Sequence, residues 1–163
     1  EELSAKTRAF LLSHPAAAAL FEYACLKTDS GEQVSEKLEK QIAESNHIGD
    51  KILILTDPLC TLDVRERIFR DIIKMFEPEG TIFLKPHPRD VLDYRKLFPE
   101  YPQFDATVPM EMLNFFPNLR FKKVVAVLTE VKAIQFADEV VRLGEDFMDA
   151  YEDPLIHRQN EQI

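Results

Sequence analysis

Three side chains able to carry positive charge alternate with prolines in one short segment, residues 85–89. Lys85, His87 and Arg89 occupy every second position, and one proline stands between each pair. Proline fixes its own φ and holds the preceding residue in an extended conformation, so the segment is stiff before any ligand binds. Arg and protonated His donate charge-assisted hydrogen bonds to phosphate oxygens, and His can also give a proton to a departing phosphate. The segment predicts a phosphate or pyrophosphate site, with a solvated, proline-rich surface turn as the alternative.

Two carboxylates are candidates for the general base that transfer to a hydroxyl group needs. Such a base must lie within about 3 Å of the hydroxyl whose proton it takes. Asp57 directly follows a strongly apolar segment, and Asp63 comes shortly after it. Asp63 also fits the N-cap of the helix expected to follow, and this is the interpretation we favour for that residue. If the chain is one half of an enzyme, the base can equally belong to the other half.

These residues stand next to segments whose patterns predict strands and a helix. Residues 51–56 and 81–85 are short apolar runs, typical of strands buried on both faces of a parallel sheet. Between them, residues 63–76 place apolar side chains at helical spacing, with Arg65 and other charged residues largely on the opposite face. The three segments predict a βαβ unit. Ligands of such sheets bind beyond the carboxyl ends of the strands, which is where the proline-rich segment stands.

The rest of the chain repeats the alternation of strand and helix less regularly. We expect strands near Phe104, at 122–128 and at 139–143, and short helices or helical turns at 91–98, 111–116, 131–136 and 145–151. Such alternation predicts an α/β fold with a doubly wound, mostly parallel, Rossmann-like sheet. We assign residues 47–163 to this domain and residues 1–46 to a helical connector or accessory segment.

Composition restricts the class of protein. The chain has 163 residues, of which 45% are hydrophobic, enough for one domain with a sizeable core. Its net charge of −9 argues against a nucleic-acid-binding surface. No apolar run approaches the roughly 18 residues of a membrane helix, and no secretory signal is recognisable. We therefore expect a cytoplasmic protein, with a peripheral position at the inner face of a membrane left open. Because the first residue is not Met, we also expect a piece of a longer protein.

The sequence implies neither a metal site nor a disulfide. Cys25 and Cys60 are far apart and have no Cys or His at the spacing typical of zinc ligands, so we expect two reduced, partly buried thiols. The acidic residues between 145 and 153 lack the Asp-x-Asp-x-Gly pattern of a calcium loop. We expect no cofactor other than the substrate itself.

Three motifs in a fixed order resemble a known family. They are Lys-Pro-His-Pro-Arg-Asp at 85–90, Val-Pro-Met-Glu-Met-Leu at 108–113 and Val-Val-Ala-Val-Leu-Thr at 124–129. Together they resemble the C-terminal half of the bacterial lipooligosaccharide and capsule sialyltransferases of glycosyltransferase family 52. The resemblance covers residues 51–152. It implies a GT-B arrangement, in which two Rossmann-like domains face each other across the catalytic cleft.

The resemblance also implies roles for individual residues. His87 would contact the nucleotide phosphate and stabilise or protonate it as the sugar departs. Glu111 would accept hydrogen bonds from the ribose hydroxyls or the base, and Thr129 would help to hold the phosphate. The nucleotide-binding set that we predict is Lys85, His87, Pro88, Arg89, Pro109, Glu111 and Thr129, with His87, Asp63 and Asp57 as catalytic candidates.

The function expected on this basis is the donor-binding half of a glycosyltransferase. It would move a sugar, with sialic acid from its CMP ester as the first candidate, to a saccharide acceptor during the synthesis of cell-surface polysaccharide or lipooligosaccharide. Its partners would be the nucleotide sugar, the acceptor and an N-terminal Rossmann-like domain of the same protein, and a homodimer is left open. The alternatives are a transferase of another activated group, such as glycerol phosphate, and a non-catalytic α/β interaction domain.

Overall fold

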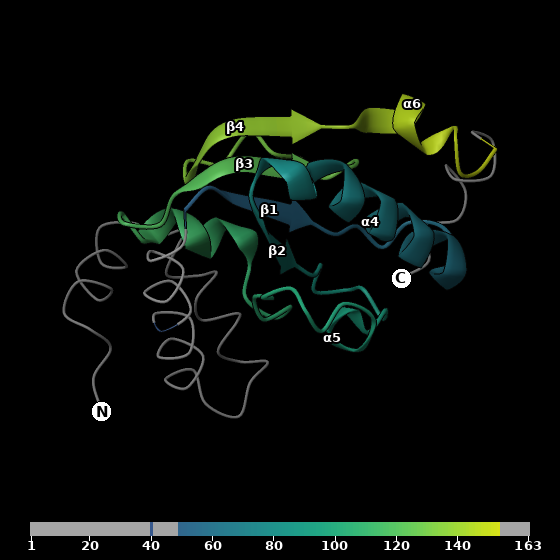
Figure 1. Cartoon of the computed structure of the whole chain (residues 1–163), viewed down its shortest axis with the longest axis horizontal. Helices are drawn as coiled ribbons and strands as arrows, with labels where there is room; N and C mark the ends of the chain where they lie inside the picture. The colour runs from purple at the N-terminus through teal and green to yellow at the C-terminus, as the bar shows by residue number, and fades with distance from the viewer. Residues whose placement is uncertain (1–39, 41–48, 154–163) are drawn as a thin grey trace.

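The computed structural model describes Lys40 and residues 49–153, which contain a four-stranded sheet flanked by helices (Figure 1). The strands are β1 (Lys51–Leu55), β2 (Thr81–Lys85), β3 (Phe121–Ala126) and β4 (Ala137–Arg142). All neighbouring strands are parallel, in the order β2-β1-β3-β4. The expected parallel α/β fold is therefore confirmed. The helical segment expected at 1–46, Cys25 and the tail after residue 153 lie outside the described residues.

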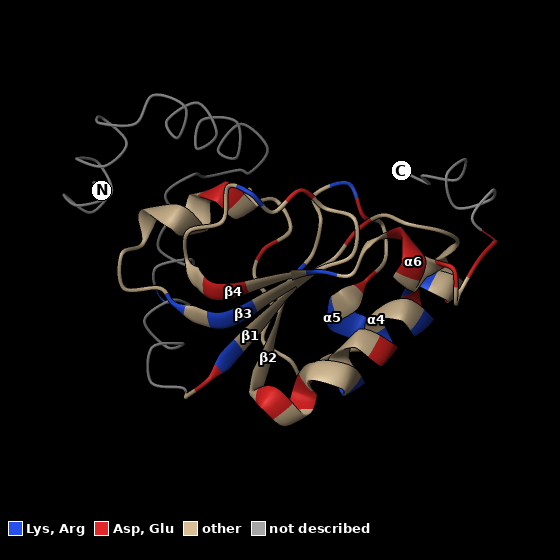
Figure 2. Ribbon diagram, turned by 90° about the horizontal axis from the view of Figure 1, so that it is seen from above, with Lys and Arg blue, Asp and Glu red and all other residues tan. Residues whose placement is uncertain are grey.

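The helical elements lie on both faces of the sheet. They are α4 (Leu62–Phe76), α5 (Tyr94–Leu97), α6 (Gly144–Met148) and the 3-10 helices η1 (Glu77–Glu79) and η2 (Met110–Phe115). Figure 2 shows α4, α5 and α6 together on one side of the strands. None of the helices in the described part of the chain is long and apolar enough to cross a membrane.

The strands alternate their side chains between two cores. Ile52 and Ile54 of β1 pack against α4, while Leu53 and Leu55 pack on the opposite face against Phe104 and η2. All five residues of β1 are buried, which agrees with the apolar run at 52–55 and includes Lys51 at the start of the strand. The sheet thus has a hydrophobic layer on each face, and β1 lies at its centre.

The connections on either side of β1 run over opposite faces of the sheet. The segment from β1 to β2 contains α4 and packs on one face. The segment from β3 to β4 packs Val131, Ile134 and Phe136 on the other face. A parallel sheet that winds in two directions leaves a crevice at the carboxyl ends of the strands where the direction changes. Here that point lies between β1 and β3.

Most predicted elements form within one to three residues of their expected bounds, but the helix predicted at 131–136 is wrong. That segment is a turn closed by a hydrogen bond from Ile134 N to Val131 O, and several of its other backbone groups bind side chains. The amide of Asn114 donates to Ala133 O and accepts from Gln135 N, at 2.8 and 2.9 Å, and the Glu130 carboxylate accepts from Val131 N. These competing partners replace the bonds of a helix.

Two further expectations for α4 are corrected. Arg65 was placed on the polar face, but it is completely buried. Asp63 was favoured as the N-cap, but the cap position is Thr61, and Asp63 lies in the first turn of the helix. By contrast, the short strand expected near Phe104 is confirmed as a parallel bridge between Gln103 and Leu84.

Candidate functional site

A cavity of about 420 Å³ opens at the carboxyl ends of the strands. It is lined by the end of β1 at Leu55 and Thr56, and by residues 85–89, 109–111 and 129–130. Three separate motifs from the sequence therefore meet in one cavity. Its volume lies within the range of roughly 300–1,000 Å³ that is usual for small-molecule sites, and its position is the crevice expected for this winding of the sheet.

The proline-rich segment forms a tight turn at the cavity. The carbonyl of His87 accepts a hydrogen bond from Asp90 N at 3.0 Å, which makes Pro88 and Arg89 the central residues of the turn. Proline favours the first central position because its φ is already set. The N–H of His87 donates to Thr56 Oγ1 at 2.9 Å and so ties the turn to the end of β1. The stiffness predicted from the prolines is thus reinforced by hydrogen bonds at both ends of the turn.

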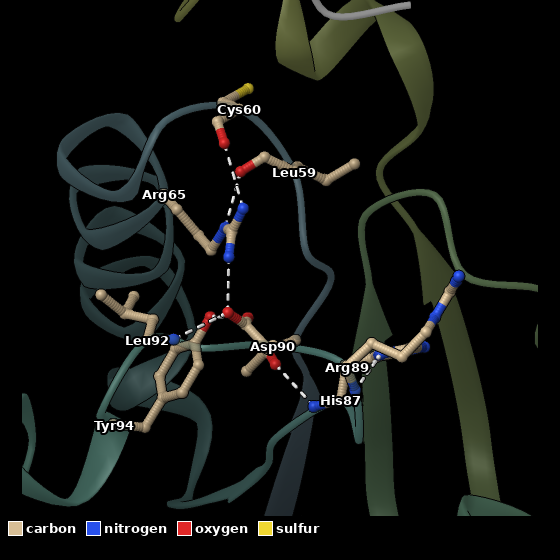
Figure 3. Close-up of polar contacts among 9 residues, drawn as sticks. Leu59, Cys60, Arg65, His87, Arg89, Asp90, Leu92 and Tyr94 are labelled. Carbon is tan, nitrogen blue, oxygen red and sulfur yellow. Dashed lines mark hydrogen bonds and ion pairs between the residues drawn. The ribbon is translucent and has the colours of Figure 1, made fainter. Parts of the chain in front are cut away.

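The ring of His87 is oriented by the same turn. Its Nδ1 accepts a hydrogen bond from Arg89 N at 3.1 Å (Figure 3). A nitrogen that accepts carries no hydrogen, so the ring is neutral with its hydrogen on Nε2. Partial burial lowers the pKa of His87 below its usual value, and the nearby charge of Arg89 lowers it further. In this arrangement the side chain offers a neutral Nε2–H donor to the cavity that it lines.

Lys85 is a buried cation in the wall of the cavity. Its side chain is almost inaccessible, with 4% of the residue exposed, and Nζ donates to the carbonyls of Pro86 and Ala106 at 2.8 and 3.3 Å. Burial lowers the pKa of Lys85 to about 8, although the negative charges of Asp105 and Glu111 oppose this shift. Its charge near neutral pH is consequently sensitive to any anion that enters the cavity.

Three further residues complete the charged lining: Arg89, Glu111 and Glu130. Arg89 is exposed at the rim and Glu111 is half-buried in the first turn of η2. Pro109 precedes that turn in an extended conformation. Glu111 therefore lies at the carboxyl edge of the sheet, where the sequence placed it. The cavity has cations along the turn and two carboxylates, Glu111 and the exposed Glu130, from the other two lining segments.

Asp57 joins the ends of β1 and β3. It is buried, with 6% exposed, and its Oδ2 accepts from the backbone N–H groups of Leu128 and Thr129 at 3.0 and 3.1 Å. Its Oδ1 accepts the hydroxyl of Thr129. Asp57 does not line the cavity, and its oxygens are engaged within the protein, so this arrangement gives it a structural task. Thr129 lines the cavity, but its N–H and O–H are both directed to Asp57 rather than to a ligand.

Asp63 is not brought to the cavity either. It is exposed at the start of α4, where hydrogen bonds from Thr61 and from backbone amides lower the pKa of its carboxyl. Of the three catalytic candidates, only His87 lines the cavity. Within residues 49–153, no group of three His, Cys, Asp or Glu side chains is arranged to hold a metal ion.

The sequence analysis missed a buried polar network next to the turn. The Arg65 guanidinium donates to Asp90 Oδ1 at 2.5 Å, and the Tyr94 hydroxyl donates to Asp90 Oδ2 at 2.7 Å (Figure 3). A signal for Arg65 was present, because it precedes Ile68 and Phe69 by three and four positions and so shares their helix face. We call Arg65, Asp90 and Tyr94 the anchor network.

Comparison with known proteins adds one similarity. No family model matches this chain, and no solved structure matches it. A protein of Haemophilus influenzae named "Uncharacterized protein" is 29% identical over 87 residues, which are 50% of this chain and 28% of that protein. The matched part thus spans less than a third of that relative. The name of that relative states no activity.

Proposed function

We propose that this chain binds the nucleotide part of a nucleotide sugar and forms the donor-binding half of a glycosyltransferase. The observation that carries the proposal is the convergence of Lys85, His87 and Arg89 with Glu111 around one cavity at the point where the sheet changes direction. Such crevices are where open α/β sheets bind nucleotides. Sialic acid from its CMP ester is the donor that the motif resemblance favours.

The phosphate would lie against the turn. His87 would donate from Nε2, Arg89 from its guanidinium at the rim, and the ammonium of Lys85 would supply charge from the buried wall. Hydrogen bonds from charged donors to phosphate contribute about 1.5–3 kcal/mol each. A phosphate nearby also favours the ammonium form of Lys85, so this side chain keeps its charge once the ligand is present.

Glu111 would bind the other end of the nucleotide. A carboxylate only accepts hydrogen bonds, so its natural partners are the ribose hydroxyls or an amino group of the base. Glu111 comes from a different segment of the lining than the turn, and we expect the phosphate to lie against the turn because Glu111 would repel it. The same charges therefore orient the nucleotide as well as bind it.

In the reaction, the acceptor hydroxyl would attack the anomeric carbon while the bond from that carbon to the phosphate oxygen breaks. Donors already directed at the phosphate stabilise the charge that develops on the leaving oxygen. Neither Asp57 nor Asp63 is placed to take the acceptor proton. The general base would then come from a second domain, and we expect this chain alone to bind nucleotide without robust turnover.

The test is ligand binding by the whole chain. At a hundredfold excess over Kd, a ligand that binds only the folded state adds about 2.7 kcal/mol to the free energy of unfolding. Thermal protection by CMP supports the proposal, and protection by CDP-glycerol alone favours a glycerol phosphate transferase instead. Protection by neither favours a non-catalytic interaction domain.

A pair of variants distinguishes a carboxylate of the binding site from a carboxylate elsewhere on the surface. Glu111→Ala should weaken CMP binding about tenfold or more, because a charged hydrogen bond is lost. Glu66→Ala removes an exposed carboxylate of α4 whose partner is Arg70 and should leave the CMP affinity unchanged. Equal CMP affinity in both variants would remove Glu111 from the site.

A further inference from the structure

We propose that Asp90 is a positioning residue for phosphate recognition: held by Arg65 and Tyr94, it fixes the turn that presents His87 and Arg89 to the anion. The proposal rests on the proposed function, since it takes the anion held by that turn to be a nucleotide phosphate. None of the three residues of the anchor network lines the cavity. They would act through the turn and not by touching the ligand.

The carboxylate of Asp90 is fully enclosed, and both of its oxygens accept hydrogen bonds. Its side chain has no exposed surface. Oδ1 accepts from Arg65 Nη1 at 2.5 Å and from Leu92 N at 3.0 Å, and Oδ2 accepts the Tyr94 hydroxyl at 2.7 Å. The backbone N–H of Asp90 closes the turn by donating to His87 O at 3.0 Å. One residue therefore links the last position of the turn to two side chains in the core.

Arg65 connects this residue to the loop between β1 and α4. Besides Asp90, its guanidinium donates to Leu59 O at 2.6 Å through Nε and to Cys60 O at 3.0 Å through Nη2. Figure 3 shows the guanidinium between these carbonyls and the carboxylate of Asp90. Only a planar group with several N–H directions can make all three contacts at once, which a Lys ammonium would not reproduce.

The turn is consequently held at both ends by groups from the β1 side of the sheet. His87 N is bound by Thr56 at one end, and Asp90 is bound by Arg65 at the other. A binding loop that is ordered before the ligand arrives avoids the entropy cost of ordering on binding. This geometry would hold His87, which lines the cavity, in one position before a ligand binds.

Stability alone is a poor explanation for a buried ion pair at this place. Replacing such a pair by apolar side chains of similar size is often neutral or stabilising, because the desolvation of two charges offsets their attraction. The pair does, however, impose one position on the turn, since the short, directional contacts of the guanidinium are lost if the carboxylate shifts. A positioning role accounts for the charges and for their location.

The experiment compares the affinities of CMP and cytidine, which differ by the phosphate. In Asp90→Asn the side chain keeps its shape and loses its charge, and CMP affinity should fall at least about tenfold while cytidine affinity changes less than about twofold. Tyr94→Phe keeps the ring in the core and removes one hydrogen bond, so CMP affinity should fall about threefold. This milder variant decides the matter if the Asn variant does not fold.

The control is a substitution of a core residue that lies away from the turn and lowers stability by a similar amount. Ile73→Ala, in the last part of α4, should lower the melting temperature and leave the ratio of CMP to cytidine affinity unchanged. If Asp90→Asn and Tyr94→Phe keep the wild-type ratio, the positioning role is wrong even though the nucleotide site stands. If the wild-type chain does not prefer CMP to cytidine, the proposed function fails and this inference fails with it.

Discussion

Cationic side chains have different partners at the two edges of the sheet. At the amino edge, cations lie against carboxylates: Lys122 pairs with Asp50 at 3.0 Å and Lys123 with Glu79 at 2.5 Å. At the carboxyl edge, the ammonium of Lys85 has carbonyl partners, and within residues 49–153 neither Lys85 nor Arg89 forms an ion pair. Both edges carry positive charge, but the ion pairs of the amino edge have no counterpart at Lys85 and Arg89 within residues 49–153.

This difference separates cations that stabilise from cations that bind. A cation paired with a carboxylate is already neutralised, and an additional anion gains little from it. A cation held by neutral carbonyls keeps its charge for a ligand, at the cost of burial, which is why the pKa of Lys85 is lowered. The acidic net charge of the chain therefore does not exclude an anion site, because local charge decides binding.

The largest effect on nucleotide binding is expected at His87. His87→Ala should lower CMP affinity by about tenfold to a hundredfold, because a hydrogen bond to the phosphate is lost from a charged or polarised donor. The melting temperature should change little, since the side chain is only half-buried and bonds only its own turn. Titration calorimetry and thermal unfolding of the same sample measure both. A large fall in melting temperature with intact CMP binding would make His87 a structural residue.

The pH dependence of binding should follow Lys85. A bound phosphate favours the ammonium, so CMP binding requires a proton once the pH exceeds the free pKa of about 8. CMP affinity should then be flat just below this pH and fall by up to about tenfold per pH unit above it. Lys85→Met should bind CMP more weakly below pH 8 and lack the slope. A slope that persists in Lys85→Met would assign the proton to another group.

The same shift has a consequence for stability, with a definite sign. The folded pKa of Lys85, about 8, lies below the ordinary 10.5, so between these values the unfolded chain binds more protons. The free energy of unfolding contributed by this residue should therefore rise with pH across the window. Denaturant unfolding of wild type and Lys85→Met at pH 7.5 and 10 gives the difference. If the difference in free energy of unfolding between wild type and Lys85→Met does not change with pH, the lowered pKa does not belong to Lys85.

A smaller effect is expected at Arg89. Because its side chain is exposed at the rim, water and salt screen its charge. Arg89→Ala should weaken CMP binding about threefold in dilute buffer, and the loss should shrink further at high salt. Measuring Kd at two ionic strengths tests this, and a salt-independent loss would place Arg89 in a desolvated contact instead.

The smallest effect on binding is expected at the amino edge. Lys123→Met removes the ion pairs with Glu79 and Glu139 and the contact of the ammonium with the Phe76 ring. CMP affinity should stay the same, while the free energy of unfolding should fall by roughly 1 kcal/mol, as for a partly exposed ion-pair network. Weaker CMP binding by this variant would show that the two edges are not independent.

Much of the fold was predictable because its signals are local. The apolar runs of β1 and β2 and the helical spacing of α4 are properties of consecutive residues, and each element formed where it was expected. The failures lie where a partner distant in the chain decides. Residues 131–136 have helical spacing, yet Asn114, from a different segment, binds their backbone.

The candidate site was likewise predictable in part. Proline chemistry made the stiffness of the Lys85–Arg89 segment predictable, and strand ends made its location predictable. The general bases were not predictable, because Asp57 became a link between two strand ends and Asp63 was left outside the cavity. A carboxylate after a strand can face the ligand or the neighbouring strand, and nothing in its local sequence distinguishes these outcomes.

By itself, the sequence determined most of the strands and helices and the edge of the sheet at which the cavity lies. It also determined which residues bring charge to the cavity. Only the tertiary structure decided which charges remain available. Arg65 is a cation like Arg89 in the sequence, but helix α4 turns it into the core, where Asp90 neutralises it. The physical reason is that periodicity is set along the chain, whereas burial and pairing depend on contacts between segments that are distant in sequence.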